Sequence, residues 1–70
     1  MSWRKSICVR RWQTGEFIEM WDYESTKERY GRIVLAHLPG REAYSDEELV
    51  DVLRHYNAYC DFEIITEMGP

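Results

Sequence analysis

The segment from about Ser2 to Glu24 predicts a β-hairpin that is apolar on both of its faces. A turn centred on Thr14-Gly15 would pair Gln13 with Glu16, and residues opposite each other in a hairpin share a face. One face then carries Ile7, Val9, Ile18 and Met20, and the other carries Cys8, Trp12, Phe17, Trp21 and Tyr23. Because a chain of 70 residues has little material to cover two such faces, we expect one face to be core. The other should be covered by a second layer or form a contact surface.

Size and composition predict one small folded domain spanning residues 1–70. The length lies near the lower limit at which a hydrophobic core suffices alone. The apolar fraction of 44% and the aromatic fraction of 14% favour a folded chain over a disordered one. No apolar run approaches the ~20 residues of a membrane span, and no apolar stretch follows the N-terminus as a secretory signal would. We therefore expect a complete cytoplasmic protein with no membrane contact.

The net charge of −4 is unevenly distributed along the chain. Residues 1–35 hold seven Lys or Arg against five acidic residues, which gives +2, and residues 36–70 hold two against eight, which gives −6. Such asymmetry predicts two electrostatically distinct surfaces.

The clearest predicted element is a helix from about Asp46 to Tyr56. Ser45 is a good N-cap, and Glu48 three residues later completes a capping box. The apolar stripe of this helix comprises Leu49, Val52, Leu53 and Tyr56, with Val50 beside it.

The chain after this helix predicts a strand with one apolar and one mostly acidic face. Cys60, Phe62, Ile64, Thr66 and Met68 alternate with Tyr59, Asp61, Glu63, Ile65 and Glu67. The acidic side chains would protect an edge strand from unwanted pairing.

Residues 26–38 allow two interpretations. As a strand, Ile33-Val34-Leu35-Ala36 is a short buried run, and Gly31 is no longer a helix defect. As a helix, Ser25 is the N-cap, and Tyr30, Ile33, Val34, His37 and Leu38 fall on one stripe. We favour the strand.

The elements together predict an α+β fold with a small antiparallel sheet. The favoured order is β-β-β-α-β, a meander with one helix packed on the face that carries Ile7 and Val9. The alternative order is β-β-α-α-β, in which two helices cover more of the sheet.

The chain shows no motif that carries catalysis, and we predict no enzyme activity, no catalytic residue, no cofactor and no metal. Cys8, His37, His55 and Cys60 are zinc-type ligands, but they do not form the close sequence pairs of zinc modules. Two cysteines are too few for a disulfide scaffold, and we expect both to be reduced thiols. The glycines are isolated, so no phosphate-binding loop is indicated.

The predicted function is that of a non-enzymatic protein-binding module. Trp12, Phe17, Trp21 and Tyr23 have the chemistry of interface anchors, and a homodimer through the same face is also allowed. Stand-alone acidic proteins of this size are common among phage and mobile-element inhibitors or accessory subunits, an analogy of size and composition only.

Two alternatives involve nucleic acid. A nucleic-acid-binding protein would use the basic and aromatic first strand, with Trp3, Arg4, Lys5, Arg10 and Arg11. The acidic net charge and the expected pairing of Arg10 with Glu19 disfavour it. The acidic second half of the chain could instead imitate a nucleic-acid backbone and block a basic protein.

Overall fold

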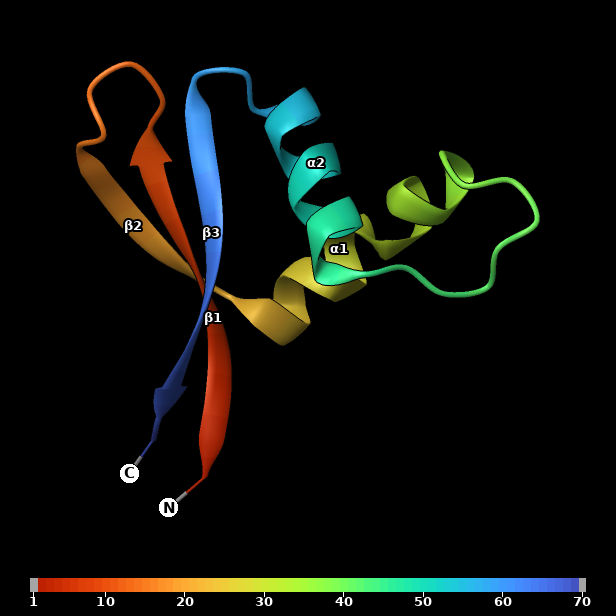
Figure 1. Cartoon of the computed structure of the whole chain (residues 1–70), viewed down its shortest axis with the longest axis horizontal. Coiled ribbons are helices and arrows are strands. Elements are labelled where there is room, and N and C mark those ends of the chain that lie inside the picture. The colour runs from red at the N-terminus through yellow and green to blue at the C-terminus, as the bar shows by residue number, and fades with distance from the viewer. Residues whose placement is uncertain (1, 70) are drawn as a thin grey trace.

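The computed structural model, which describes residues 2–69, has three strands and two helices. Strands β1 (Trp3–Arg11) and β2 (Phe17–Asp22) are followed by helices α1 (Tyr23–Ala36) and α2 (Asp46–Tyr56) and by strand β3 (Cys60–Met68). The sheet is antiparallel with the order β2-β1-β3, so β1 is central and β3 returns to its free side (Figure 1). The α+β class is therefore confirmed, in the alternative order β-β-α-α-β.

The favoured third strand was wrong, because residues 23–36 form helix α1. The helix begins earlier than Ser25: Asp22 is the N-cap, and its carboxylate accepts from the Ser25 N–H at 2.9 Å. Gly31 lies inside this helix, and a Cβ added there would lie 3.1 Å from the Tyr44 hydroxyl, closer than ordinary van der Waals contact. The predicted helical stripe faces the core except for His37, which is exposed.

The hairpin forms, but its register differs from the prediction. The loop has four residues, 12–15, closed by a 2.7 Å bond from the Arg11 N–H to the Glu16 carbonyl, and Gly15 adopts φ +74°. Arg10 lies opposite Phe17, whereas Val9 lies opposite Glu19, so Ile18 is an extra residue in β2. A one-residue shift exchanges the two faces of a strand. Trp21 therefore lies opposite Ile7 and Met20 opposite Cys8, the reverse of the predicted faces.

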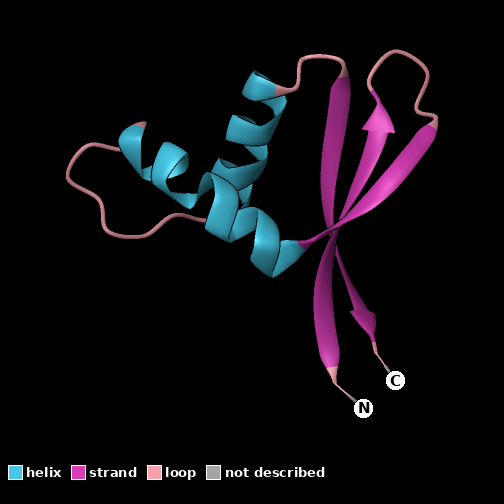
Figure 2. Cartoon of the chain, turned by 180° about the vertical axis from the view of Figure 1, so that it is seen from behind, coloured by secondary structure: helices cyan, strands magenta, loops and turns pink. Residues whose placement is uncertain are grey.

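Both helices lie on the same side of the sheet (Figure 2). The core combines the helix-facing side chains of the sheet with one stripe from each helix. Its buried members are Ile7, Val9, Tyr23, Val34, Leu49, Val52, Leu53 and Phe62.

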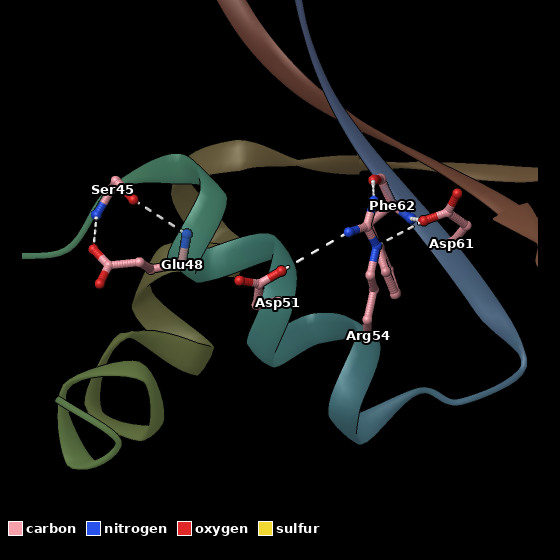
Figure 3. Close-up of polar contacts among 6 residues, drawn as sticks. All are labelled: Ser45, Glu48, Asp51, Arg54, Asp61 and Phe62. Carbon is pink, nitrogen blue, oxygen red and sulfur yellow. Dashed lines mark hydrogen bonds and ion pairs between the residues drawn. The ribbon is translucent and has the colours of Figure 1, made fainter.

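Helix α2 and strand β3 are confirmed as predicted. The Ser45 hydroxyl accepts from the Glu48 N–H at 3.2 Å, and the Glu48 carboxylate accepts from the Ser45 N–H at 2.8 Å, which completes the capping box (Figure 3). In β3, Phe62 and Ile64 pair with Val9 and Ile7 on the core side. Tyr56, expected in the apolar stripe, is instead 52% exposed.

Candidate interaction surface

The side of the sheet opposite the helices, which we call the uncovered face, carries an exposed apolar band. The register places Phe17 beside Arg10, Met20 beside Cys8 and Ile65 beside Ser6 on this face. The extra residue Ile18 is also exposed, as are Phe17 at 52% and Met20 at 42%. Within residues 2–69, no helix packs on this side of the sheet.

Two further aromatic side chains extend the band at the hairpin end of the sheet. The Trp12 N–H donates to the Tyr59 carbonyl at 2.9 Å, so these residues lie opposite each other just after the end of β1 and just before the start of β3. Trp12 is 67% exposed and Tyr59 83% exposed. Large apolar groups that gather on one open face are typical of interaction sites. The band therefore comprises the exposed residues Trp12, Phe17, Ile18, Met20 and Tyr59, together with the half-buried Ile65.

The uncovered face also carries more acidic than basic side chains. The alternation of β1 places Arg4 and Arg10 on it, opposite Glu67 and Asp61 of β3. Glu63 and Asp22 lie on the same face, next to Cys8 and Ser6 respectively. Since the Asp61 carboxylate is paired with Arg54 of α2, two arginines remain against three carboxylates, which gives this face a charge of −1. Along β3 the uncovered face carries an acidic row, Asp61, Glu63 and Glu67, with Ile65 between Glu63 and Glu67.

The four predicted anchor residues do not share one face. Trp12 and Phe17 are exposed in the band, but Trp21 is half-buried on the helix side, with its ring centroid 5.2 Å from that of Phe62. Its indole N–H donates to the Glu19 carboxylate at 2.6 Å. The expected pairing of Arg10 with Glu19 was consequently wrong, because Glu19 lies opposite Val9.

Tyr23 is also a core residue and begins helix α1. It is 9% exposed, and its hydroxyl donates to the carboxylate of Asp46 at the start of α2. Burial and this hydrogen bond raise the pKa of the Tyr23 hydroxyl. The Lys5 ammonium lies 2.8 Å from the same carboxylate, and bonds from Lys5 and Tyr23 lower the pKa of Asp46. These contacts explain Tyr23 and Lys5 as structural residues that link β1, α1 and α2.

Three members of the exposed band, Met20, Ile18 and Tyr59, were not among the predicted anchor residues. The alternation of β3 correctly placed Tyr59 on the mostly acidic face, but it did not mark Tyr59 as a site residue. Met20 was assigned to the core because the extra residue in β2 is invisible in the apolar pattern.

The predicted nucleic-acid residues are divided between the two sides of the sheet. Arg4 and Arg10 lie on the uncovered face, whereas Trp3, Lys5 and Arg11 lie on the side of the helices. Lys5 is paired with Asp46, and the Arg11 guanidinium lies 3.6 Å from the Glu16 carboxylate. The basic side chains therefore do not form one continuous strip.

Within residues 2–69, the two cysteines and the two histidines do not gather into one metal-binding cluster. Cys8 and Cys60 are both free thiols, with Cys8 on the uncovered face and Cys60 on the helix side. The rings of His37 and His55 lie 6.1 Å apart, centroid to centroid, at the ends of the two helices.

In the part of the chain that the structure describes, no helix is both long and apolar enough to cross a membrane.

Comparisons of this chain with known protein families, with curated proteins and with solved structures found no match. A functional proposal therefore depends on the surface geometry of the chain itself.

Proposed function

We propose that this protein is a non-enzymatic protein-binding module that occludes a surface of its partner with the uncovered face. The observation that carries the proposal is the exposed apolar band, which places Trp12, Phe17, Met20 and Tyr59 together on one side of a thin domain. Aromatic and methionine side chains are enriched at the centres of protein interfaces, where removal of water gives most of the binding energy.

The charge of the uncovered face indicates the chemistry of the partner. Asp61 of the acidic row is already paired with Arg54, but Glu63 and Glu67 form no ion pair within the described residues and would need cations from the partner in an interface. The partner surface should therefore offer an apolar patch bordered by lysine or arginine side chains. A basic nucleic-acid-binding protein is one class of partner with this chemistry, which keeps nucleic-acid mimicry as a second form of the same proposal.

A second copy of this chain fits the uncovered face poorly. If the two-fold axis of a face-to-face dimer runs along the strands, β3 of one copy lies over β2 of the other, so the acidic row meets the apolar band. If the axis runs across the strands, the two acidic rows oppose each other. Neither arrangement pairs the carboxylates with cations, so we propose a different protein as the partner.

The proposed role is that of a small inhibitor or accessory subunit, as in phages and other mobile elements. Such a module needs no cofactor and no catalytic residue, because its effect comes from covering a surface. The two free thiols suit a reducing compartment, and we accordingly propose a cytoplasmic location.

The test compares the partners captured from source-cell lysate by the tagged wild-type protein and by the double variant Phe17→Ser, Met20→Ser. Both side chains are exposed on the uncovered face, so the variant should fold normally. Tyr56→Ser is the matched control, because Tyr56 is equally exposed but lies on α2, away from this face. Each capture is repeated after nuclease treatment.

The proposal expects a stoichiometric, nuclease-resistant partner that the Phe17, Met20 variant loses and the Tyr56 variant keeps. Cross-links from this partner should join its lysines to Glu63 or Glu67. A partner that both variants retain would reject the uncovered face as the site. A signal that disappears with nuclease would favour nucleic-acid binding, and recovery of this chain alone would favour a homodimer.

A further inference from the structure

The outer edge of β3 has a closed part and an open part. Two backbone hydrogen bonds show which residues of β3 direct their N–H and C=O groups toward β1. The Trp12 N–H donates to the Tyr59 carbonyl, and the Gly69 N–H donates to the Ser2 carbonyl. Since antiparallel strands exchange hydrogen bonds at every second residue pair, the odd-numbered residues of β3 bond to β1. The even-numbered residues direct their N–H and C=O groups toward the outer edge.

The edge is closed at Phe62. Its N–H donates to the Asp61 carboxylate at 2.9 Å, and its carbonyl accepts from the Arg54 guanidinium at 3.4 Å. Arg54 reaches across from α2 and also donates to Asp61 at 2.8 Å (Figure 3). The Cys60 N–H is likewise occupied, because it donates to the Asn57 carbonyl. No further strand can pair with this part of β3 without displacing Arg54.

The edge is open from Ile64 to Met68. No side chain of residues 2–69 bonds to the backbone of Ile64, Thr66 or Met68. Their outward donors and acceptors extend over five residues, about 16 Å of strand at roughly 3.3 Å per residue. An unpaired edge of this length is sufficient to receive an added strand.

A groove of about 630 Å³ runs beside this open edge, between β3 and helix α2. Its apolar lining comes from Val50, Phe62 and Ile64. The acidic residues that line it are Asp46, Glu47, Asp51 and Glu63, whereas its two cations, Lys5 and Arg54, already pair with Asp46 and Asp61. The groove therefore combines three apolar side chains with an excess of negative charge.

We infer that the open edge of β3 binds an extended segment of a partner protein by strand addition. In a strand paired with Ile64–Met68, alternate side chains point to opposite faces. One set would enter the groove against Val50 and Ile64, and should be apolar. The other set would lie on the uncovered face beside Glu63 and Glu67, and should be basic. The occupant is thus a segment in which apolar and basic residues alternate.

The inference does not depend on the apolar band of the uncovered face, because it uses the backbone edge of β3, the groove beside α2 and the carboxylates of Glu63 and Glu67. Strand addition at β3 can therefore be disproved while binding through the apolar band holds, and binding through the apolar band can be disproved while strand addition holds. The test uses the full chain labelled with ¹⁵N and two blocked probe peptides, one of alternating valine and lysine and one of alternating valine and glutamate. The readouts are amide chemical shifts and amide hydrogen exchange.

The lysine peptide should shift the amides of Ile64, Thr66 and Met68 and slow their hydrogen exchange, whereas the glutamate peptide should not. Thr66→Pro removes an outward N–H without removing a bond to β1, and should weaken binding at least about tenfold. Thr66→Val keeps that N–H and is the matched control. Val50→Lys, which places a cation in the groove, should weaken binding similarly and remains informative if the proline variant does not fold.

Equal binding of the lysine peptide to folded Thr66→Pro would overturn the inference. Shifts confined to Phe17 and Met20 would also overturn it, because they would place the peptide on the uncovered face. Slow exchange at Ile64 and Thr66 without peptide, appearing only at high protein concentration, would identify the occupant as a second copy and reject a partner segment.

Discussion

Trp21 and Phe62 pack ring against ring across the central strand, with centroids 5.2 Å apart and planes inclined at 54°. The two residues come from opposite edges of the sheet, and Ile7 and Val9 of β1 lie between them in the pairing. The ring of Tyr30 of α1 also stacks on Trp21, with ring centroids 6.5 Å apart and planes inclined at 12°. This contact therefore joins β2, β3 and α1.

Trp21→Ala should destabilise the domain by about 2–4 kcal/mol, because it removes a half-buried aromatic side chain from the core. A domain of 70 residues has a total stability of roughly 4–10 kcal/mol, so a large part of it would be lost. Trp12→Ala, at an exposed position, should change stability by less than about 0.5 kcal/mol. Urea unfolding followed by circular dichroism measures both. Comparable losses for the two variants would contradict the placement of Trp21.

Gly31 and Tyr44 should be energetically coupled. Alanine normally stabilises a helix interior by about 1 kcal/mol relative to glycine, but here its Cβ would lie 3.1 Å from the Tyr44 hydroxyl. We expect Gly31→Ala to give little or no gain alone and a gain of roughly 0.5–1 kcal/mol in the Tyr44→Phe background. A double-mutant cycle from thermal unfolding measures this coupling. Strictly additive effects would show that Tyr44 does not restrict residue 31.

Glu48 should contribute to loss of stability in acid. The two terminal nitrogens of Arg41, Nη1 and Nη2, each lie 2.8 Å from an oxygen of the Glu48 carboxylate. These bonds, with that from the Ser45 N–H, lower the pKa of Glu48 from 4.5 to about 2. A carboxylate whose pKa is lower in the folded state stabilises the fold above its unfolded-state pKa. Its contribution should therefore be complete above about pH 4.5 and be lost as the pH falls toward 2.

Glu48→Gln should make the free energy of unfolding depend less steeply on pH between 4.5 and 2. Urea titrations at several pH values within this range measure the slope. The control is Glu47→Gln, which removes one negative charge from the same helix turn outside the capping box. An unchanged slope in Glu48→Gln would show that the ion pair with Arg41 does not persist in solution.

Arg54→Ala should promote self-association. The guanidinium covers the outward carbonyl of Phe62 and holds Asp61, so its removal extends the open edge of β3 toward the helix. The stability cost should be below about 1 kcal/mol, because the pair with Asp61 is substantially exposed. Sedimentation velocity at increasing concentration should show dimers or larger species for Arg54→Ala. Arg32→Ala, the same change on the exposed side of α1, should remain like wild type.

Local interactions made α2 and β3 predictable from the sequence. Ser45 and Glu48 satisfy each other's backbone groups within four residues, so the helix start needs no tertiary partner. The period of two from Cys60 to Met68 places Phe62 and Ile64 on one side whatever strand lies beside them. The existence of the first hairpin followed from the same kind of pattern, whereas the pattern left open whether its second face is covered or exposed.

Tertiary packing decided the helix at residues 23–36 and the register of the hairpin. The run Ile33-Val34-Leu35-Ala36 suits a buried strand or a helix equally, and the helix forms where Val34 contacts the core and Tyr44 occupies the space beside Gly31. The extra residue Ile18 leaves no apolar signature, yet it turns Trp21 toward Phe62 and Met20 outward. The sequence alone determined that the hairpin is apolar on both sides. Only the burial of Trp21 against β3 and α1 decided which side chains remain exposed, because a shift of one residue exchanges the faces at almost no local cost.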